Sequence, residues 1–284
     1  MIPSFLIFLR EGIEGSMIIS MMCTFLATAG RRDLFRWVFV GVGSAIVGSC
    51  LFGVVLYAVA KDSFIHSTAQ TWFETCVFLL AVVTLTYMTF WMKSHSRSMS
   101  SELKARMGAA IAGGSAFSLA TLAFVTVGRE SVETVIFLLA IAFKTPALSL
   151  VSGAVLGLAV SIAISVAIYR LGVRVNMKRF FTVVGIALMV VAAGLLADAI
   201  QNLQGLGVLP GGSQTLWNTS TVLSDNSNLG DILHGLFGYA SSPSLLQVSA
   251  WALFLFIGLR AFLSASRPTH PKAQAGTPGT TANA

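Results

Sequence analysis

Long runs of apolar residues, separated by short polar segments, make up most of the chain. A helix needs roughly 20 residues to cross the hydrocarbon core of a bilayer. Runs of about that length occupy residues 4–29, 37–60, 70–92, 110–143, 147–170, 180–201 and 244–263. They lack the strict alternation of apolar and polar residues that membrane barrel strands need. The pattern predicts an all-α integral membrane protein with seven transmembrane helices.

The composition agrees with a membrane protein and excludes several other classes. Of the 284 residues, 55% are hydrophobic and only 10% are charged, whereas soluble domains carry about 25% charged residues. The net charge of +7 does not indicate nucleic acid as a partner, because the basic residues lie in short loops between apolar runs. No HExxH or GxxxxGK[ST] motif occurs, and these motifs mark zinc proteases and nucleotide-binding loops. We therefore expect the lipid bilayer as the surroundings and no enzymatic activity.

The basic residues predict an orientation in the membrane. Fourteen of the 18 Lys and Arg residues follow the first, third, fifth or seventh run. By the positive-inside rule, the N-terminus should lie outside and the C-terminus in the cytoplasm. Residues 202–243 then form an outer loop, which contains no Lys or Arg, and residues 264–284, rich in Pro, Gly, Ala and Thr, form a disordered cytoplasmic tail.

Two short charged tracts interrupt the first and fourth runs with the same pattern. Both Arg10-Glu11-Gly12-Ile13-Glu14 and Arg129-Glu130-Ser131-Val132-Glu133 read Arg-Glu-x-x-Glu. A charge at the bilayer centre costs at least about 2.5–3.5 kcal/mol and is therefore treated as a functional candidate. At 100° per residue, the three charged side chains of each tract share one arc of their helix. The arcs should face each other or a wet cavity.

The tracts also suggest an internal repeat. The first and fourth helices should run in opposite directions, with each tract about 14–20 Å from the outer end. Residues 1–92 and 110–201 could then form an inverted 3+3 repeat, an arrangement that places a transport site near the midplane. The seventh helix, 244–263, would lie outside the symmetry and complete a permease domain over residues 1–263.

The tract residues suit cation binding. Glu11, Glu14, Glu130 and Glu133 offer the oxygen ligands that hard and borderline cations accept. Arg10 and Arg129 should limit repulsion among them in the absence of a cation. The absence of thiolate and imidazole argues against zinc or copper(I) as cargo. Two other interpretations remain: an interhelical ion-pair brace, and a proton relay that binds no metal.

Further acidic residues lie closer to the outer face. Glu74 and Asp198, near the outer ends of their helices, are candidates to line the entrance to the site, or else are solvated at the interface. In the outer loop, Asp225, Asp231 and His234 are weaker candidates for metal capture.

The paired Arg-Glu-x-x-Glu tracts in a seven-span chain resemble the oxidase-dependent iron transporter family, which includes the fungal high-affinity iron permeases and the bacterial EfeU-type permeases. Residues 3–14, 82–92 and 235–244 resemble the family's opening segment, its third span and the approach to its last span. The departures are Ser131, where the family's tract often has Gly, and His234, where some relatives have an acid.

The resemblance implies import of iron across a plasma membrane, most simply a bacterial inner membrane. It also implies that the glutamates of both tracts are ligands of the ion, and Glu74 stands where bacterial relatives also have an acid in the third span. Iron, as Fe²⁺ or Fe³⁺, would be the transported substrate, with no permanently bound cofactor. An extracytoplasmic oxidase, a peroxidase or a cupredoxin-type protein on a separate chain is an implied partner. The alternatives are a proton-coupled transporter of another divalent metal, such as manganese, and a non-transporting sensor or assembly subunit.

Overall fold

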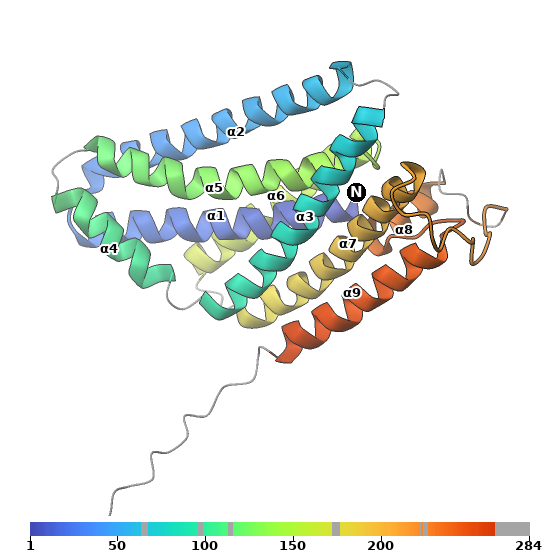
Figure 1. The fold of residues 1–284 in the computed structure, drawn as a ribbon. Helices are drawn as coiled ribbons and strands as arrows, with labels where there is room; N and C mark the ends of the chain where they lie inside the picture. The colour runs from blue at the N-terminus through green and yellow to red at the C-terminus, as the bar shows by residue number, and fades with distance from the viewer. Residues whose placement is uncertain are drawn as a thin grey trace, which may run out of the picture.

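The computed structural model describes residues 1–63, 68–95, 99–112, 116–171, 177–221, 223 and 227–264. Long helices packed side by side dominate this part of the chain (Figure 1). They are α1 (Ile2–Thr28), α2 (Phe35–Ser63), α3 (Thr68–His95), α4 (Met99–Ala112), α5 (Ala116–Ala142), α6 (Ala147–Leu171), α7 (Met177–Gly205), α8 (Asn228–Phe237) and α9 (Leu245–Ser264), with a short 3-10 turn at Arg32–Leu34. The expectation of an all-α fold is confirmed for the described residues.

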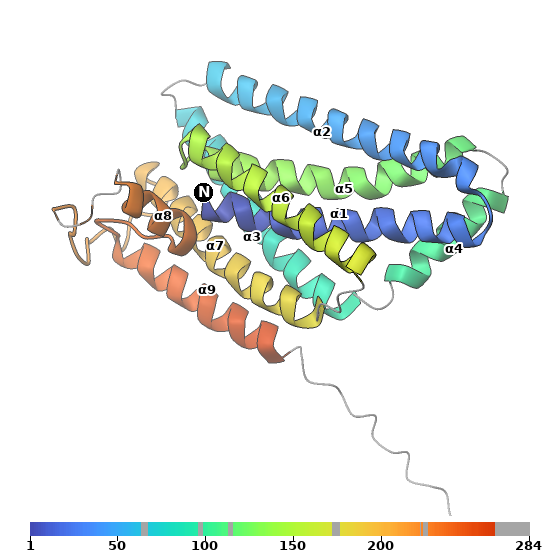
Figure 2. The same cartoon turned by 180° about the vertical axis from the view of Figure 1, so that it is seen from behind.

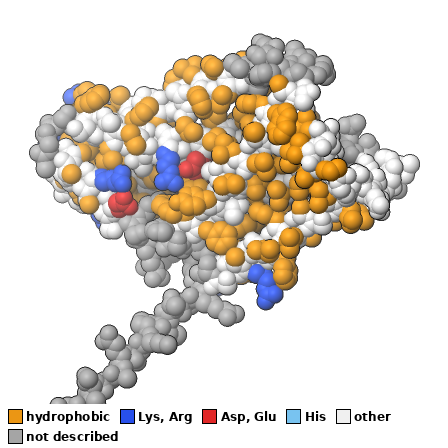
Figure 3. All heavy atoms as spheres, in the orientation of Figure 1, with side chains coloured by type: hydrophobic (Ala, Val, Ile, Leu, Met, Phe, Trp, Pro, Cys, Tyr) orange, Lys and Arg blue, Asp and Glu red, His pale blue; other side chains and the backbone are white. Residues whose placement is uncertain are grey.

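Five of these helices are long and apolar enough to cross a membrane: α2, α3, α6, α7 and α9. Helices α1 and α5 have 27 residues each and are therefore about 40 Å long, but each carries three charges near its middle. Hydrophobic side chains spread over the face seen in Figure 3, with few charged side chains among them. This surface suits lipid, since a soluble protein rarely exposes large apolar patches.

Two helices differ from the sequence expectation. The described residues of the run predicted as one helix over 110–143 belong to two helices, since residues 110–112 are part of α4 and α5 begins at Ala116. Helix α8 lies within the predicted outer loop. The predicted tail, apart from Ser264, lies outside the described residues.

Close helix pairs organise the bundle. The most extensive contacts join α1 to α6 and α2 to α5, followed by α3 to α7. Small residues allow the backbones to approach: a Cβ on Gly157 of α6 would lie 2.5 Å from the Phe5 carbonyl oxygen of α1. On α2, a Cβ on Gly41 would collide with the Ala120 carbonyl oxygen of α5. Small residues at such contacts are typical of helix packing in membranes, where dispersion contacts replace the hydrophobic effect.

Two apolar clusters fill the interior. One is formed mainly by α3, α5 and α7 and includes Ile7 of α1. The other joins α1, α2, α4 and α5 and includes Ile18 of α1 and Val127 of α5. Along α1, the charged tract lies between Ile7 and Ile18. Along α5, it lies between Val127 and Phe137, which belongs to the first cluster. The charged residues therefore form a polar layer between two apolar ones.

The two ends of the bundle differ. The N-terminus and α8 lie at one end, whereas α4 lies at the opposite end (Figures 1 and 2). Helices α1 and α5 run in opposite directions between these ends (Figure 1). Their charged tracts can therefore meet at mid-length.

Candidate metal centre

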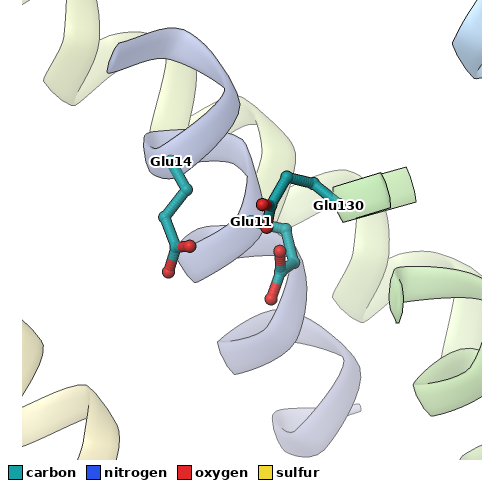
Figure 4. A group of neighbouring side chains, drawn as sticks. All are labelled: Glu11, Glu14 and Glu130. Carbon is teal, nitrogen blue, oxygen red and sulfur yellow. The ribbon is translucent and has the colours of Figure 1, made fainter. Parts of the chain in front are cut away.

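Three carboxylates from the two tracts come together between α1 and α5. Glu11, Glu14 and Glu130 each offer one oxygen, and the three oxygens lie within 4.8 Å of one another. Figure 4 shows Glu130 reaching from α5 toward Glu11, with Glu14 beside them on α1. Glu11 and Glu14 are buried, and Glu130 is half-buried. The fourth tract glutamate, Glu133, does not belong to this group.

Each tract arginine pairs with the glutamate one helical turn later. Arg10 Nε donates to Glu14 Oε1 at 2.8 Å, and Arg129 Nε donates to Glu133 Oε1 at 3.1 Å. Arg10 Nη1 also lies 3.5 Å from Glu11 Oε1. The pairs differ in exposure, because the Arg10 side chain is 4% exposed and the Arg129 side chain 49%. The repeated sequence therefore has two different environments.

Helix α3 supplies a contact to both arginines that the sequence analysis missed. Arg10 Nη2 donates to Met92 Sδ, and Arg129 Nη2 donates to Met88 Sδ, each at 3.6 Å. Both methionines are buried, and a thioether sulfur is a weak acceptor. Met88 and Met92 lie one helical turn apart in the third apolar run. This spacing, which places both sulfurs on one helix face, was the feature of the sequence that could have indicated the contacts. The shared helix α3 holds the two guanidinium groups beside the carboxylates.

Several carboxylate oxygens in this cluster accept no hydrogen bond from the described residues. They are both oxygens of Glu11 and one oxygen each of Glu130 and Glu133, all buried. Burying a charged oxygen that accepts no hydrogen bond is costly, even where a guanidinium nitrogen lies 3.5 Å away, as at Glu11 Oε1. A structure that retains four such oxygens in one layer is suited to a ligand that satisfies them.

A dehydrated cation fits the three converging oxygens. Carboxylate oxygens bind small divalent cations at about 2.1 Å, so two ligands on opposite sides of one ion lie roughly 4.2 Å apart. The observed spread of up to 4.8 Å is slightly wider, and small rotations of the side chains would close it. The donor set consists of oxygens, which suits a hard or borderline cation.

Three of the other candidate residues, Glu74, Asp198 and His234, lie in the described part of the chain. Glu74 is half-buried on α3 and accepts a hydrogen bond from Gln70 Nε2 at 2.9 Å. Asp198 is buried on α7, and its Oδ2 lies 3.5 Å from Nε2 of His234 on α8. That carboxylate raises the pKa of His234, chiefly through the hydrogen bond to the imidazole. Asp225 lies outside the described residues, as does the side chain of Asp231.

The difference in burial between the arginines predicts unequal effects of their removal. Arg10→Ala should destabilise the protein by several kcal/mol, since removing one partner of a buried ion pair costs about 3–5 kcal/mol. Arg129→Ala should cost less, because 49% of the Arg129 side chain is already exposed, although its partner Glu133 is only 13% exposed. Thermal unfolding of the two purified variants, followed by tryptophan fluorescence, compares them. Equal losses, or a larger loss for Arg129→Ala, would contradict this reading of the cluster.

Comparison with known proteins identifies the family. Residues 1–266 match the family described as Iron permease FTR1 family. The chain is 32% identical over 266 residues to the ferrous iron permease EfeU of Escherichia coli O6:H1, covering 93% of this chain and 95% of that protein. It is 32% identical over 271 residues to the ferrous iron permease EfeU of Yersinia pestis, covering 95% of each. No solved structure matches. The chain, an integral membrane protein, belongs to the iron permease FTR1 family.

Proposed function

We propose that this protein imports iron across the bacterial inner membrane through a site built from the four tract glutamates, the converging Glu11, Glu14 and Glu130 together with Glu133. The observation that carries the proposal is the convergence of three carboxylate oxygens within 4.8 Å, beside buried oxygens that accept no hydrogen bond from the described residues. The arginine–glutamate pairs lie within single helices, Arg10–Glu14 on α1 and Arg129–Glu133 on α5, so they do not brace one helix against the other and leave these oxygens without a purpose.

The charge of the cluster favours ferrous iron as the cargo. When all four carboxylates are ionised, they and the two guanidinium groups carry a net charge of −2, which one divalent ion neutralises. Both relatives compared above are named ferrous iron permeases. A permanent cofactor has no role in this proposal, because the ion is the substrate. An oxidase, peroxidase or cupredoxin-type protein would act on a separate chain, before the ion reaches the permease.

The helix pairing supports seven spans with an inverted repeat. If α1, α2 and α3 correspond to α5, α6 and α7, exchanging the halves converts the α1–α6 contact into the α5–α2 contact. These are the two most extensive contacts of the bundle, and α3–α7, which the exchange leaves unchanged, is the next. Helix α9 would be the seventh span. The end of the bundle with the N-terminus and α8 would face outward, as the positive-inside rule indicates.

In this arrangement, alternating access requires the halves to rock about the carboxylates. The ion must also bind weakly enough to leave. The nearby guanidinium groups serve this requirement, since they offer the carboxylates an alternative positive partner once the ion departs. The proposed transport therefore needs no ATP-hydrolysing domain in this chain.

Proteoliposomes containing the purified protein test transport directly. We expect radioactive iron supplied as Fe(II) to accumulate inside them, and to do so faster than in liposomes without protein. An excess of manganese should compete poorly. Strong competition by manganese would favour a broader divalent-metal transporter, and no flux of either metal would favour the sensor or assembly subunit. Supplying iron as Fe(III) in parallel identifies the oxidation state, and a proton gradient shows whether transport is proton-coupled.

A further inference from the structure

A second group of potential metal ligands lies at the end of the bundle that carries the N-terminus. Asp198 and His234 line a cavity of about 20 Å³, together with Pro3 at the start of α1 and Lys144 after α5. That volume is enough for a single water-sized guest. Pro3 precedes Glu11 by eight residues, or about 12 Å along a helix. The cavity therefore lies nearer the N-terminal end of α1 than the carboxylate cluster does, and this is the outer end in the proposed orientation.

Close backbone contact between α7 and α8 holds the two side chains together. Helix α8 ends at Gly238, whose φ of 69° is a left-handed conformation that favours glycine. A Cβ added to Gly194 of α7 would lie 3.0 Å from the Gly238 backbone. Asp198 follows Gly194 by one helical turn, and His234 precedes Gly238 by one turn. The pairing of Asp198 with His234 is therefore built into the packing of two helices.

A hydrogen bond fixes the orientation of the imidazole. His234 Nδ1 lies 2.7 Å from the Tyr239 carbonyl oxygen, and a carbonyl can only accept, so Nδ1 carries the hydrogen. Nε2 then points at Asp198 Oδ2, 3.5 Å away. In the neutral imidazole, the lone pair of Nε2 faces the carboxylate oxygen, and a cation between them, either a proton or a metal ion, removes the repulsion. A second ring nitrogen held by a carbonyl is also the usual support of a metal-binding histidine.

We propose that Asp198 and His234 form an outer binding site for a divalent transition-metal ion. That the ion is ferrous iron on its way to the carboxylate cluster rests on the proposed function. One carboxylate oxygen and one imidazole nitrogen make a donor set suited to borderline first-row ions. The ammonium group of Lys144, which lies above the Phe78 ring with its Nζ 5.8 Å from the centroid, weakens the affinity of the cavity for cations. Weak binding suits a site that must pass its ion onward.

Pulsed electron paramagnetic resonance of the full chain loaded with Mn(II), in detergent and without a histidine tag, tests this site. The carboxylate cluster contains no histidine, so it contributes no imidazole nitrogen coupling to bound Mn(II). We expect such a coupling in the unmodified protein and its loss in His234→Ala. The matched controls His66→Ala and His95→Ala should keep it. A spectrum without nitrogen coupling, or coupling that survives His234→Ala, would overturn the proposal.

A second variant controls for misfolding of His234→Ala, and iron uptake adds an independent measurement. Asp198→Asn is nearly isosteric and should also lose the nitrogen coupling, since one of the two ligands loses its charge. In proteoliposomes, His234→Ala should raise the iron concentration for half-maximal uptake by about tenfold, the scale of losing one support of a metal site. The maximal rate should stay unchanged. If the unmodified protein moves no iron, the proposed function fails, yet the spectrum still decides whether the outer site binds metal.

Discussion

Iron uptake is expected to fall by about 100-fold or more when Glu14 is replaced by glutamine. Glu14 is 3% exposed, and it contributes both an oxygen of the carboxylate cluster and the partner of Arg10 Nε. Glutamine keeps the size of the side chain but removes its charge, which leaves the cation without one anionic ligand. Loss of even a supporting group commonly costs 10–100-fold at a metal site. Uptake of radioactive iron by cells and proteoliposomes measures the effect, and Glu130→Gln should behave alike.

The chain offers a matched control for this substitution. Glu102 on α4 also pairs with an arginine one turn away, and Arg106 Nη2 donates to its Oε1 at 2.7 Å. The two side chains are 63% and 61% exposed, so Glu102→Gln removes the same kind of charge from a surface pair. Uptake should be unchanged in that variant. Normal uptake by both Glu14→Gln and Glu130→Gln, in protein that elutes as a single species, would remove the cluster from the transport path.

Substituting Gly41 with leucine should strongly destabilise the packing of α2 against α5. A Cβ at this position would collide with the Ala120 carbonyl oxygen and would lie 2.9 Å from Ala123 Cβ. A backbone atom cannot move aside as a flexible side chain can, so α2 must separate from α5. Overpacking a well-packed interior costs about 1–3 kcal/mol, and occasionally more. The yield of monodisperse protein after extraction in detergent should therefore fall sharply, and Gly41→Ala should show a smaller loss.

The same helix provides the control. Gly48, also on α2, is exposed, and a Cβ there would meet no atom within 4 Å. Gly48→Leu should therefore leave the yield and the thermal stability close to those of the unmodified protein. If Gly41→Leu is tolerated as well as Gly48→Leu, then α2 and α5 do not pack as closely as the structure describes.

Features that depend on local geometry could be predicted from the sequence. The spacing of Arg10 and Glu14 places them one turn apart on any helix, and the predicted proximity of these side chains is confirmed by the 2.8 Å contact. Helix α8 was missed because it is short and lies in a polar segment. Its caps were visible, however: Ser227 accepts a hydrogen bond from the Gly230 N–H, and Gly238 ends the helix.

Features that depend on how helices rotate about one another could not be predicted. A helix that is apolar on nearly every side gives no amphipathic pattern to show which face packs against a neighbour. The sequence alone gives no reason to distinguish the four tract glutamates. In the structure, Glu11, Glu14 and Glu130 converge, whereas Glu133 pairs with Arg129. The contacts from Met88 and Met92, on a third helix, depend on the same rotation.

By itself, the sequence determined that the chain is helical and built for a membrane, and that two charged tracts interrupt its apolar runs. These conclusions follow from run length, hydrophobicity and spacing along one helix. Only the tertiary structure decided which carboxylates converge, that Arg10 is buried while Arg129 is half exposed, and that His234 meets Asp198 from 36 residues away. The physical reason is that these contacts depend on how the helices are rotated against one another, which the apolar pattern leaves free. At Asp198 and His234, the close approach of Gly194 to Gly238 fixes that rotation.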